Sequence, residues 1–181
     1  MDVTCISDLH GHLPELPGGD LLIVAGDLTA RDKTDEYLEF YAWLDEQNYK
    51  CKIVVAGNHD NALAKPEYMG RSDRFHPAIY LCDSGTEFEG LKIWGSPWTK
   101  TFEGMNPHCM AFTCETEEEL DSKFAKIPEG LNILITHSPV RGFVDKLSNG
   151  ENAGSFALKK ALWKMFEPPQ FIICGHIHEA Y

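Results

Sequence analysis

Five apolar runs in this chain each end in a turn that carries histidine, aspartate or both, and this repeated pattern constrains the fold more than any other feature. The run over residues 52–56 is typical of a buried strand, and Gly57-Asn58-His59-Asp60 follows it directly. A hydrophobic core does not accommodate an amide, an imidazole and a carboxylate in succession, so this turn predicts a functional site. Four other runs end in the same way, at Asp8-Leu9-His10, Gly26-Asp27, His137 and Gly175-His176-Ile177-His178.

The order of strand-like and helix-like segments predicts the α/β class. Runs of buried-strand type occupy residues 3–7, 21–25, 52–56, 132–136 and 171–174. Helical patterns run from Thr34 to about residue 47, from the capping box of Thr116 and Glu119 to about 126, and from Ser155 to about 167. We expect one domain over residues 1–181, with a largely parallel sheet, helices on its faces and a site at the carboxyl ends of the strands.

Two stretches do not follow this alternation. Short runs at 79–81, 87–89 and 91–94 are typical of an antiparallel meander, and residues 96–115 are expected to form a long loop. In that region Trp94, Trp98 and Phe102 are candidates for the rim of a pocket that holds a base or an aromatic leaving group. Plain packing of the loop explains these aromatic residues equally well.

Composition limits the possible partners. The chain has 28 acidic and 16 basic residues, a net charge of -12, and no basic stripe, so a nucleic-acid surface is not expected. Its six cysteines lie outside any C-x-x-C motif, and no signal peptide or apolar run of roughly 20 residues is visible. We therefore expect reduced thiols and a cytoplasmic protein without a membrane span. The sequence does not indicate an oligomeric state.

The polar turns together offer a ligand set for metal ions. Imidazole and carboxylate without thiolate suit Mn, Fe, Zn, Co or Ni in a catalytic site. Seven groups, with His59 set aside, exceed the needs of one ion and suit two ions that share a carboxylate. Two divalent ions, two aspartates and a hydroxide leave a net charge of about +1, which attracts a phosphate oxygen. The seven are Asp8, His10, Asp27, Asn58, His137, His176 and His178.

The same five blocks, in this order, resemble those of the calcineurin-like metallophosphoesterase superfamily, which implies a β-sandwich flanked by helices in four αββα layers. Ser96-Pro97-Trp98-Thr99 and Ile127-Pro128-Glu129-Gly130 also resemble the small metallophosphoesterase-domain phosphodiesterases. The resemblance implies hydrolysis of phosphodiesters or small phosphomonoesters by hydroxide held between two divalent ions, manganese favoured, without a covalent enzyme intermediate.

The resemblance also implies a role for each residue. The first metal would be held by Asp8, His10 and His178, and the second by Asn58, His137 and His176. Asp27 would bridge the two metals. His59 would act on the phosphoryl charge or the leaving oxygen, and Asp60 would orient the His59 ring by a hydrogen bond.

Several alternatives stay open. The family usually continues with β-structure beyond the last histidine, so we expect a short second sheet or a fragment that ends at Tyr181. Arg141 is a candidate phosphate contact or an ordinary surface arginine, and His12, His76 and His108 are assigned no role. A catalytically silent scaffold, as in the small subunit of retromer, and a nuclease are the competing functions.

Overall fold

The buried strands predicted from the sequence assemble into two stacked sheets. The computed structural model describes residues 1–71, 73–102 and 104–180. The first sheet is parallel throughout, in the order β1 (Val3–Ile6), β2 (Gly19–Ala25), β3 (Tyr49–Val55) and β4 (Ile79–Tyr80). The second sheet has the order β10 (Phe171–Ile173), β9 (Ile133–Thr136), β6 (Leu91–Ser96) and β5 (Ser84–Phe88).

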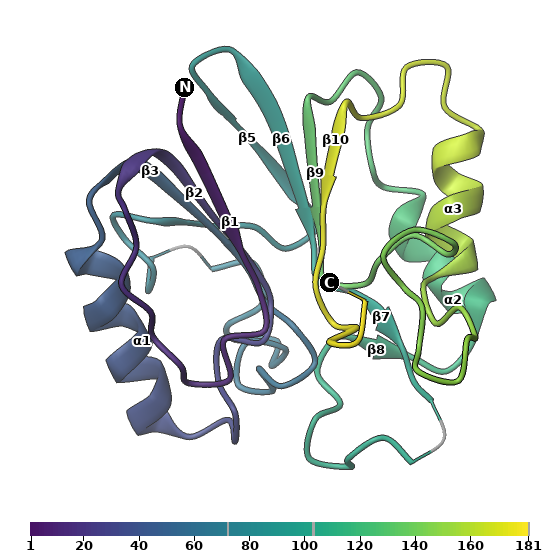
Figure 1. Cartoon of the computed structure of the whole chain (residues 1–181), viewed down its shortest axis with the longest axis horizontal. Helices are drawn as coiled ribbons and strands as arrows, with labels where there is room; N and C mark the ends of the chain where they lie inside the picture. The colour runs from purple at the N-terminus through teal and green to yellow at the C-terminus, as the bar shows by residue number, and fades with distance from the viewer. Residues whose placement is uncertain (72, 103, 181) are drawn as a thin grey trace.

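Helices cover the outer faces of both sheets. Figure 1 shows α1 (Thr34–Glu46) on the outside of the first sheet, and α2 (Glu117–Phe124) and α3 (Phe156–Trp163) on the outside of the second. Apolar side chains such as Ile23 and Ile135 pack between the sheets, while Phe40 and Leu158 belong to separate clusters beneath the helices. This is the expected four-layer αββα arrangement, because each sheet buries one face against the other and one against helices.

The helix signals were mostly accurate at the beginnings of the helices. Thr116 and Glu119 form the predicted capping box of α2, and the Ser155 hydroxyl accepts the N–H of Leu158 at the start of α3. Helix α1 is flanked by Lys33 rather than capped by Thr34. Helix α3 ends at Trp163, four residues before the predicted end.

The predicted meander was wrong in one strand. Of the three predicted runs, the last two form β5 and β6, which pair in antiparallel fashion, whereas the first forms β4, which joins the first sheet parallel to β3. The chain crosses from one sheet to the other between residues 80 and 84, where the Leu81 side chain packs between the sheets. The long loop also contains a small parallel ladder of β7 (Thr99–Lys100) and β8 (Thr113–Cys114).

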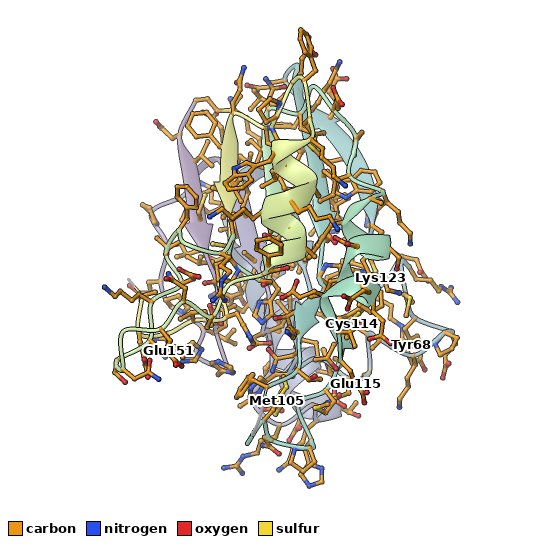
Figure 2. All side chains as sticks on the ribbon, turned by 90° about the vertical axis from the view of Figure 1, so that its right-hand side faces the viewer. Tyr68, Met105, Cys114, Glu115, Lys123 and Glu151 are labelled. Carbon is orange, nitrogen blue, oxygen red and sulfur yellow. The ribbon has the colours of Figure 1, made fainter. Side chains whose placement is uncertain are left out.

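The register brings the polar turns to one end of the molecule. Ile6 pairs with Val24, Ala25 with Val55, and Ile173 with Ile135, so the carboxyl ends of five strands lie side by side. The loops that carry Met105 and Glu151 lie at the same end, the lower one in Figure 2.

Three sequence-based expectations concern the chain as a whole. All six cysteines are free, as predicted. Among the described residues, no helix combines the length and the apolarity that a membrane crossing requires. Tyr181 lies outside the described residues, so the single domain over 1–181 and the shortened second sheet stay predictions.

Candidate metal centre

The backbone at the strand ends is held in an unusual conformation. Nine non-glycine residues in the described part of the chain have a positive φ, and four of them are predicted ligands. L-residues occupy this region at a cost of about 1–3 kcal/mol each, so the surrounding structure must hold them there. The N–H of Asp8 donates to Gly26 O and that of His10 to Asp27 O, both at 2.9 Å. The four ligands are Asp8 (54°), His10 (46°), Asp27 (53°) and His176 (74°).

The first ligand group follows β1 and β10, which belong to different sheets. Asp8, His10 and His178 offer ligand atoms that lie within 4.8 Å of one another. His178 Nε2 is 3.3 Å from Asp8 Oδ1 and 3.1 Å from His10 Nε2. The backbone N–H of His176 donates to both Asp8 carboxylate oxygens, at 2.9 and 3.1 Å. This contact fixes the β10 turn against the β1 turn.

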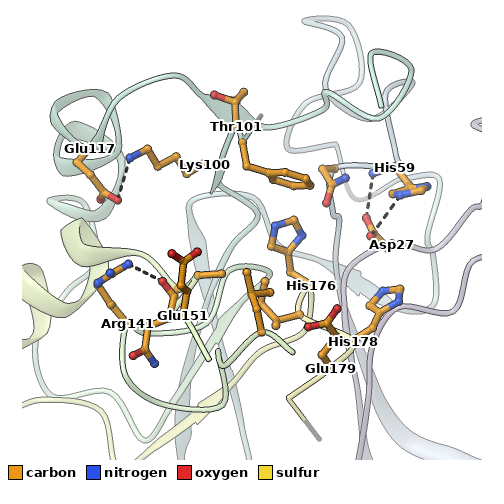
Figure 3. Close-up of a pocket in the computed structure, with 17 residues that line it drawn as sticks. Asp27, His59, Lys100, Thr101, Glu117, Arg141, Glu151, His176, His178 and Glu179 are labelled. Carbon is orange, nitrogen blue, oxygen red and sulfur yellow. Dashed lines mark hydrogen bonds and ion pairs between the residues drawn. The ribbon is translucent and has the colours of Figure 1, made fainter. Parts of the chain in front are cut away.

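The second group follows β2, β3, β9 and β10. Asp27, His137 and His176 again lie within 4.8 Å of one another through their ligand atoms. His137 Nε2 is 3.0 Å from Asn58 Oδ1, which adds the amide oxygen to this group. Figure 3 shows His176 between the Asp27 side of the pocket and its far wall. The structure therefore brings all seven predicted ligands together in two adjacent groups.

Asp27 faces both groups. Its Oδ2 is 3.8 Å from His10 Nε2, whereas its Oδ1 is 3.4 Å from His137 Nε2. An ion with ligand bonds of about 2.1 Å keeps its nearest ligand atoms about 3.0–3.4 Å apart, close to the spacings found in both groups. The donor types and their spacing fit two divalent ions with the Asp27 carboxylate between them.

Glycine at two strand ends makes room for these carboxylates. A Cβ atom on Gly57 would lie 2.2 Å from Asp27 Oδ1, and one on Gly175 would lie 2.4 Å from Asp8 Oδ2. Both distances are far below van der Waals contact. The glycines in the sequence blocks are therefore explained by the close approach of a neighbouring ligand.

Polar contacts behind the ligands fix their orientation. His137 Nδ1 lies 3.0 Å from Ala25 O, and because a carbonyl only accepts hydrogen bonds, Nδ1 carries the hydrogen. Its Nε2 lone pair is thereby left for a metal. The amide nitrogen of Asn58 donates to Cys109 O at 3.2 Å, which turns Oδ1 toward His137. Cys109 gave no sequence signal for this role, because the contact depends on how the loop folds over the 58–61 turn.

Burial and mutual attraction set the charges of the second group. Burial raises the pKa of Asp27, but His137, the N–H of His59 and the His59 ring more than offset this and hold the pKa well below its ordinary value. Burial lowers the pKa of His137, but the Asp27 carboxylate raises it to about 9. Burial, with a smaller effect of His137, lowers the pKa of His176 to about 3. The charged Asp27 carboxylate therefore favours a cation beside it, which is the protonated His137 ring when no metal is bound. A metal would displace the His137 proton, whereas His176 is already neutral as a ligand must be.

His59 faces the centre, but Asp60 is not its partner. His59 Nε2 is 4.0 Å from Asp27 Oδ2, while His59 Nδ1 lies 3.0 Å from Ala30 O and 3.4 Å from Cys109 Sγ. The prediction that the Asp60 carboxylate orients the His59 ring by a hydrogen bond was wrong. The fully buried Asp60 carboxylate instead accepts N–H groups that shape the turns, and burial, with Asp27, raises its pKa to about 7. Its backbone donors are Gly57 (2.8 Å), Thr29 (3.1 Å) and Leu28 (3.2 Å).

A cavity of about 680 Å³ opens from this centre. Arg141 and Phe102, two residues singled out in the sequence, line it. Trp98 instead packs against Phe112 and donates to Asp83. Figure 3 shows Lys100, Glu117 and Arg141 at the wall opposite Asp27 and His59. Neither Lys100 nor Glu117 was predicted, since Lys100 lies in the short strand β7 and Glu117 opens α2, and neither residue follows one of the polar turns. Among the described residues, no metal-ligand group includes His12, His76 or His108.

Comparisons with known proteins agree with this geometry. A family model described as calcineurin-like phosphoesterase matches residues 1–180. The chain is 33% identical over 202 residues to metallophosphoesterase domain-containing protein 1 of Homo sapiens, an alignment that covers 98% of this chain and 60% of the relative. It is 30% identical to UPF0046 protein T07D4.2 of Caenorhabditis elegans, over 98% of this chain and 51% of that protein.

The chain thus spans about half to three-fifths of the length of these two relatives. A solved crystal structure has the same fold, with a TM-score of 0.68 at 14% identity over 97% of this chain and 83% of the other. The match of the family model to nearly the whole chain, together with the relatives, shows that the chain belongs to the calcineurin-like phosphoesterase family.

Proposed function

We propose that this chain is a metal-dependent phosphoesterase that holds two divalent ions, Mn²⁺ in preference, and hydrolyses small phosphodiesters. The single observation that supports this most is the position of Asp27, whose two oxygens face two separate groups of nitrogen and oxygen ligands. When bound, two divalent ions supply positive charge for the phosphate oxygens and a hydroxide nucleophile at neutral pH.

The chain's own residues provide the rest of the chemistry. We assign the first ion to Asp8, His10 and His178, the second to Asn58, His137 and His176, and both to Asp27. The contact of His59 Nδ1 with a backbone carbonyl leaves its Nε2 directed at the pocket. When the ring carries a second proton at Nε2, it is placed to donate that proton to a phosphoryl or leaving-group oxygen. Asp60 acts indirectly, by holding the 57–60 turn against the turn that follows β2.

The test uses protein stripped with a chelator and reloaded with Mn²⁺. We expect metal-dependent turnover of bis(4-nitrophenyl) phosphate, and slower turnover of 4-nitrophenyl phosphate. Asp27→Ala should abolish both activities, whereas Asp121→Ala, at a partly exposed position of α2 outside the cavity lining, should leave them unchanged. Failure of the reloaded protein to hydrolyse either ester would overturn the proposal and favour the scaffold.

A further inference from the structure

The cavity beside the metal centre has an apolar side that the proposed chemistry does not use. Phe102, Leu147 and Ile177 line it together with the ligands His176 and His178. The Phe102 side chain is 59% exposed, although a phenyl ring is usually buried in a core. Its ring centroid lies 6.3 Å from that of His176, which places it next to the second ligand group.

The backbone holds Phe102 in this position. The N–H of Thr101 donates to Cys114 O at 2.9 Å, directly after the ladder of β7 and β8. On the other side, the N–H of Met105 donates to Phe102 O at 3.1 Å. The ring is therefore carried by an anchored segment, and its exposure is not that of a free loop tip.

The charged groups around the cavity already have partners within the protein. Lys100 Nζ lies 3.6 Å from Glu117 Oε1, and Arg141 Nη1 donates to Asn152 O at 2.7 Å. Glu151 accepts a hydrogen bond from Asn149, and Glu179 accepts one from the backbone of Ser148. The phenyl face is thus the part of the wall whose burial by a ligand would cost no existing polar contact.

We propose that Phe102, with Leu147 and Ile177, forms a binding site for a planar apolar group, an aryl or heteroaryl ring, carried by the phosphate compound that the metal centre binds. This inference rests on the proposed function, because it requires the phosphoryl group at the metals. The ring of the ligand packs on the Phe102 face and contributes through apolar burial and ring–ring attraction. Phe102 thereby selects among substrates and takes no part in the bond-breaking step.

Two phosphonates that differ only in the presence of a ring test this site. We would measure the binding of phenylphosphonate and ethylphosphonate to the Mn²⁺-loaded protein by calorimetry. The native chain should bind the phenyl compound about two- to tenfold more tightly. Phe102→Ala should remove this preference and leave ethylphosphonate affinity unchanged, and Phe102→Trp should retain the preference. Phe156→Ala removes a ring of similar exposure, 51%, on α3 and should behave as the native chain.

The outcomes separate this proposal from the function on which it rests. Equal affinities in the native chain, or a preference that survives in Phe102→Ala, would overturn the aromatic site and leave the phosphoesterase intact. A parallel loss of both affinities in Phe102→Ala would overturn it as well, because the residue would then support the centre as a whole. If the native chain bound neither phosphonate and hydrolysed neither chromogenic ester, the proposed function itself would fail.

Discussion

At the scale of single residues, the position of His59 fits two roles, that of a metal ligand and that of a proton donor. Its Nε2 forms a third group with Asp27 and His10, all within 4.8 Å, which is compatible with a ligand. Its other ring nitrogen is hydrogen-bonded to a backbone carbonyl, as in the candidate ligand His137. The two groups that hold all seven predicted ligands are complete without it, so we assign it to proton transfer.

Replacement of His59 tests that assignment. His59→Ala should keep both metals and lower kcat for the diester about 10²- to 10⁴-fold, because only the proton donor is lost. Metal content and turnover would be measured on the same sample, with His12→Ala as the control, an exposed histidine outside every ligand group. Loss of one metal from His59→Ala would show that the residue is a ligand.

Close packing at Gly57 gives a second prediction at this scale. Gly57→Ala places a methyl group 2.2 Å from Asp27 Oδ1, so either the turn or the carboxylate must move. We expect the variant to lose metal and to unfold with a free energy lower by about 1–3 kcal/mol, measured in urea. Gly85→Ala, whose Cβ would lie no closer than 3.2 Å to its neighbours, is the control. Native metal content in Gly57→Ala would contradict the packing argument.

The convergence of the seven candidate ligands could be predicted from the sequence because each follows a recognisable strand, and parallel strands bring their ends to one edge. The partners of Asp60 and the contacts of Cys109 could not. These contacts depend on side-chain directions within turns of positive φ, and no spacing rule along the chain encodes those directions.

At the scale of elements, the loop between β9 and α3 is organised by one buried carboxylate. Asp145 is 1% exposed and accepts hydrogen bonds from Gly142 N, Gly154 N and Asn152 Nδ2. Burial raises the pKa of Asp145, but these donors outweigh it and hold the pKa below its ordinary value of 3.8. The stability that this carboxylate contributes is therefore present above that value and is lost as the pH falls through the lower folded-state pKa.

Asp145→Asn should show this pH dependence. At pH 6.5 we expect the free energy of unfolding to fall by about 1–3 kcal/mol, because a charged acceptor of three hydrogen bonds is lost. The difference from the native chain should shrink as the pH falls from 3.8 through the lower folded-state pKa, because the native carboxyl then becomes protonated as well. Urea unfolding at pH 6.5 and at several pH values below 3.8 measures it, with Asp121→Asn as the control, a partly exposed carboxylate that pairs with Lys160 and accepts no backbone N–H within the described part of the chain. A difference that stayed constant with pH would contradict the account.

Element boundaries followed the sequence only where a cap or a long apolar run marked them. The Thr116 capping box located the start of α2, and the run over 21–25 located β2. The run over 79–81 located the two-residue strand β4 but not its partner, since its pairing with β3 is a long-range contact that a local pattern does not reveal.

At the scale of the whole molecule, the candidate metal centre joins the two sheets. Asp8, Asp27 and Asn58 follow strands of the first sheet, whereas His137, His176 and His178 follow strands of the second. Ions bound between them would link the two sheets and stabilise the folded state by mass action.

Thermal unfolding measures this link. Mn²⁺ at 100 times its dissociation constant should add about 2.7 kcal/mol to the free energy of unfolding for each ion bound, and each such increment should raise the midpoint by about 5–10 °C. Asp27→Ala should show a much smaller rise at the same concentration. A midpoint that did not move in the native chain would indicate that the sheets meet without binding metal there.

The most direct test of the whole account is a count of metal ions per chain. The native protein, reloaded with Mn²⁺ and desalted, should contain two ions per chain by elemental analysis, and Asp27→Ala should contain fewer than one. One ion or none in the native protein, or two ions retained in Asp27→Ala, would contradict a centre in which a single carboxylate serves both metals.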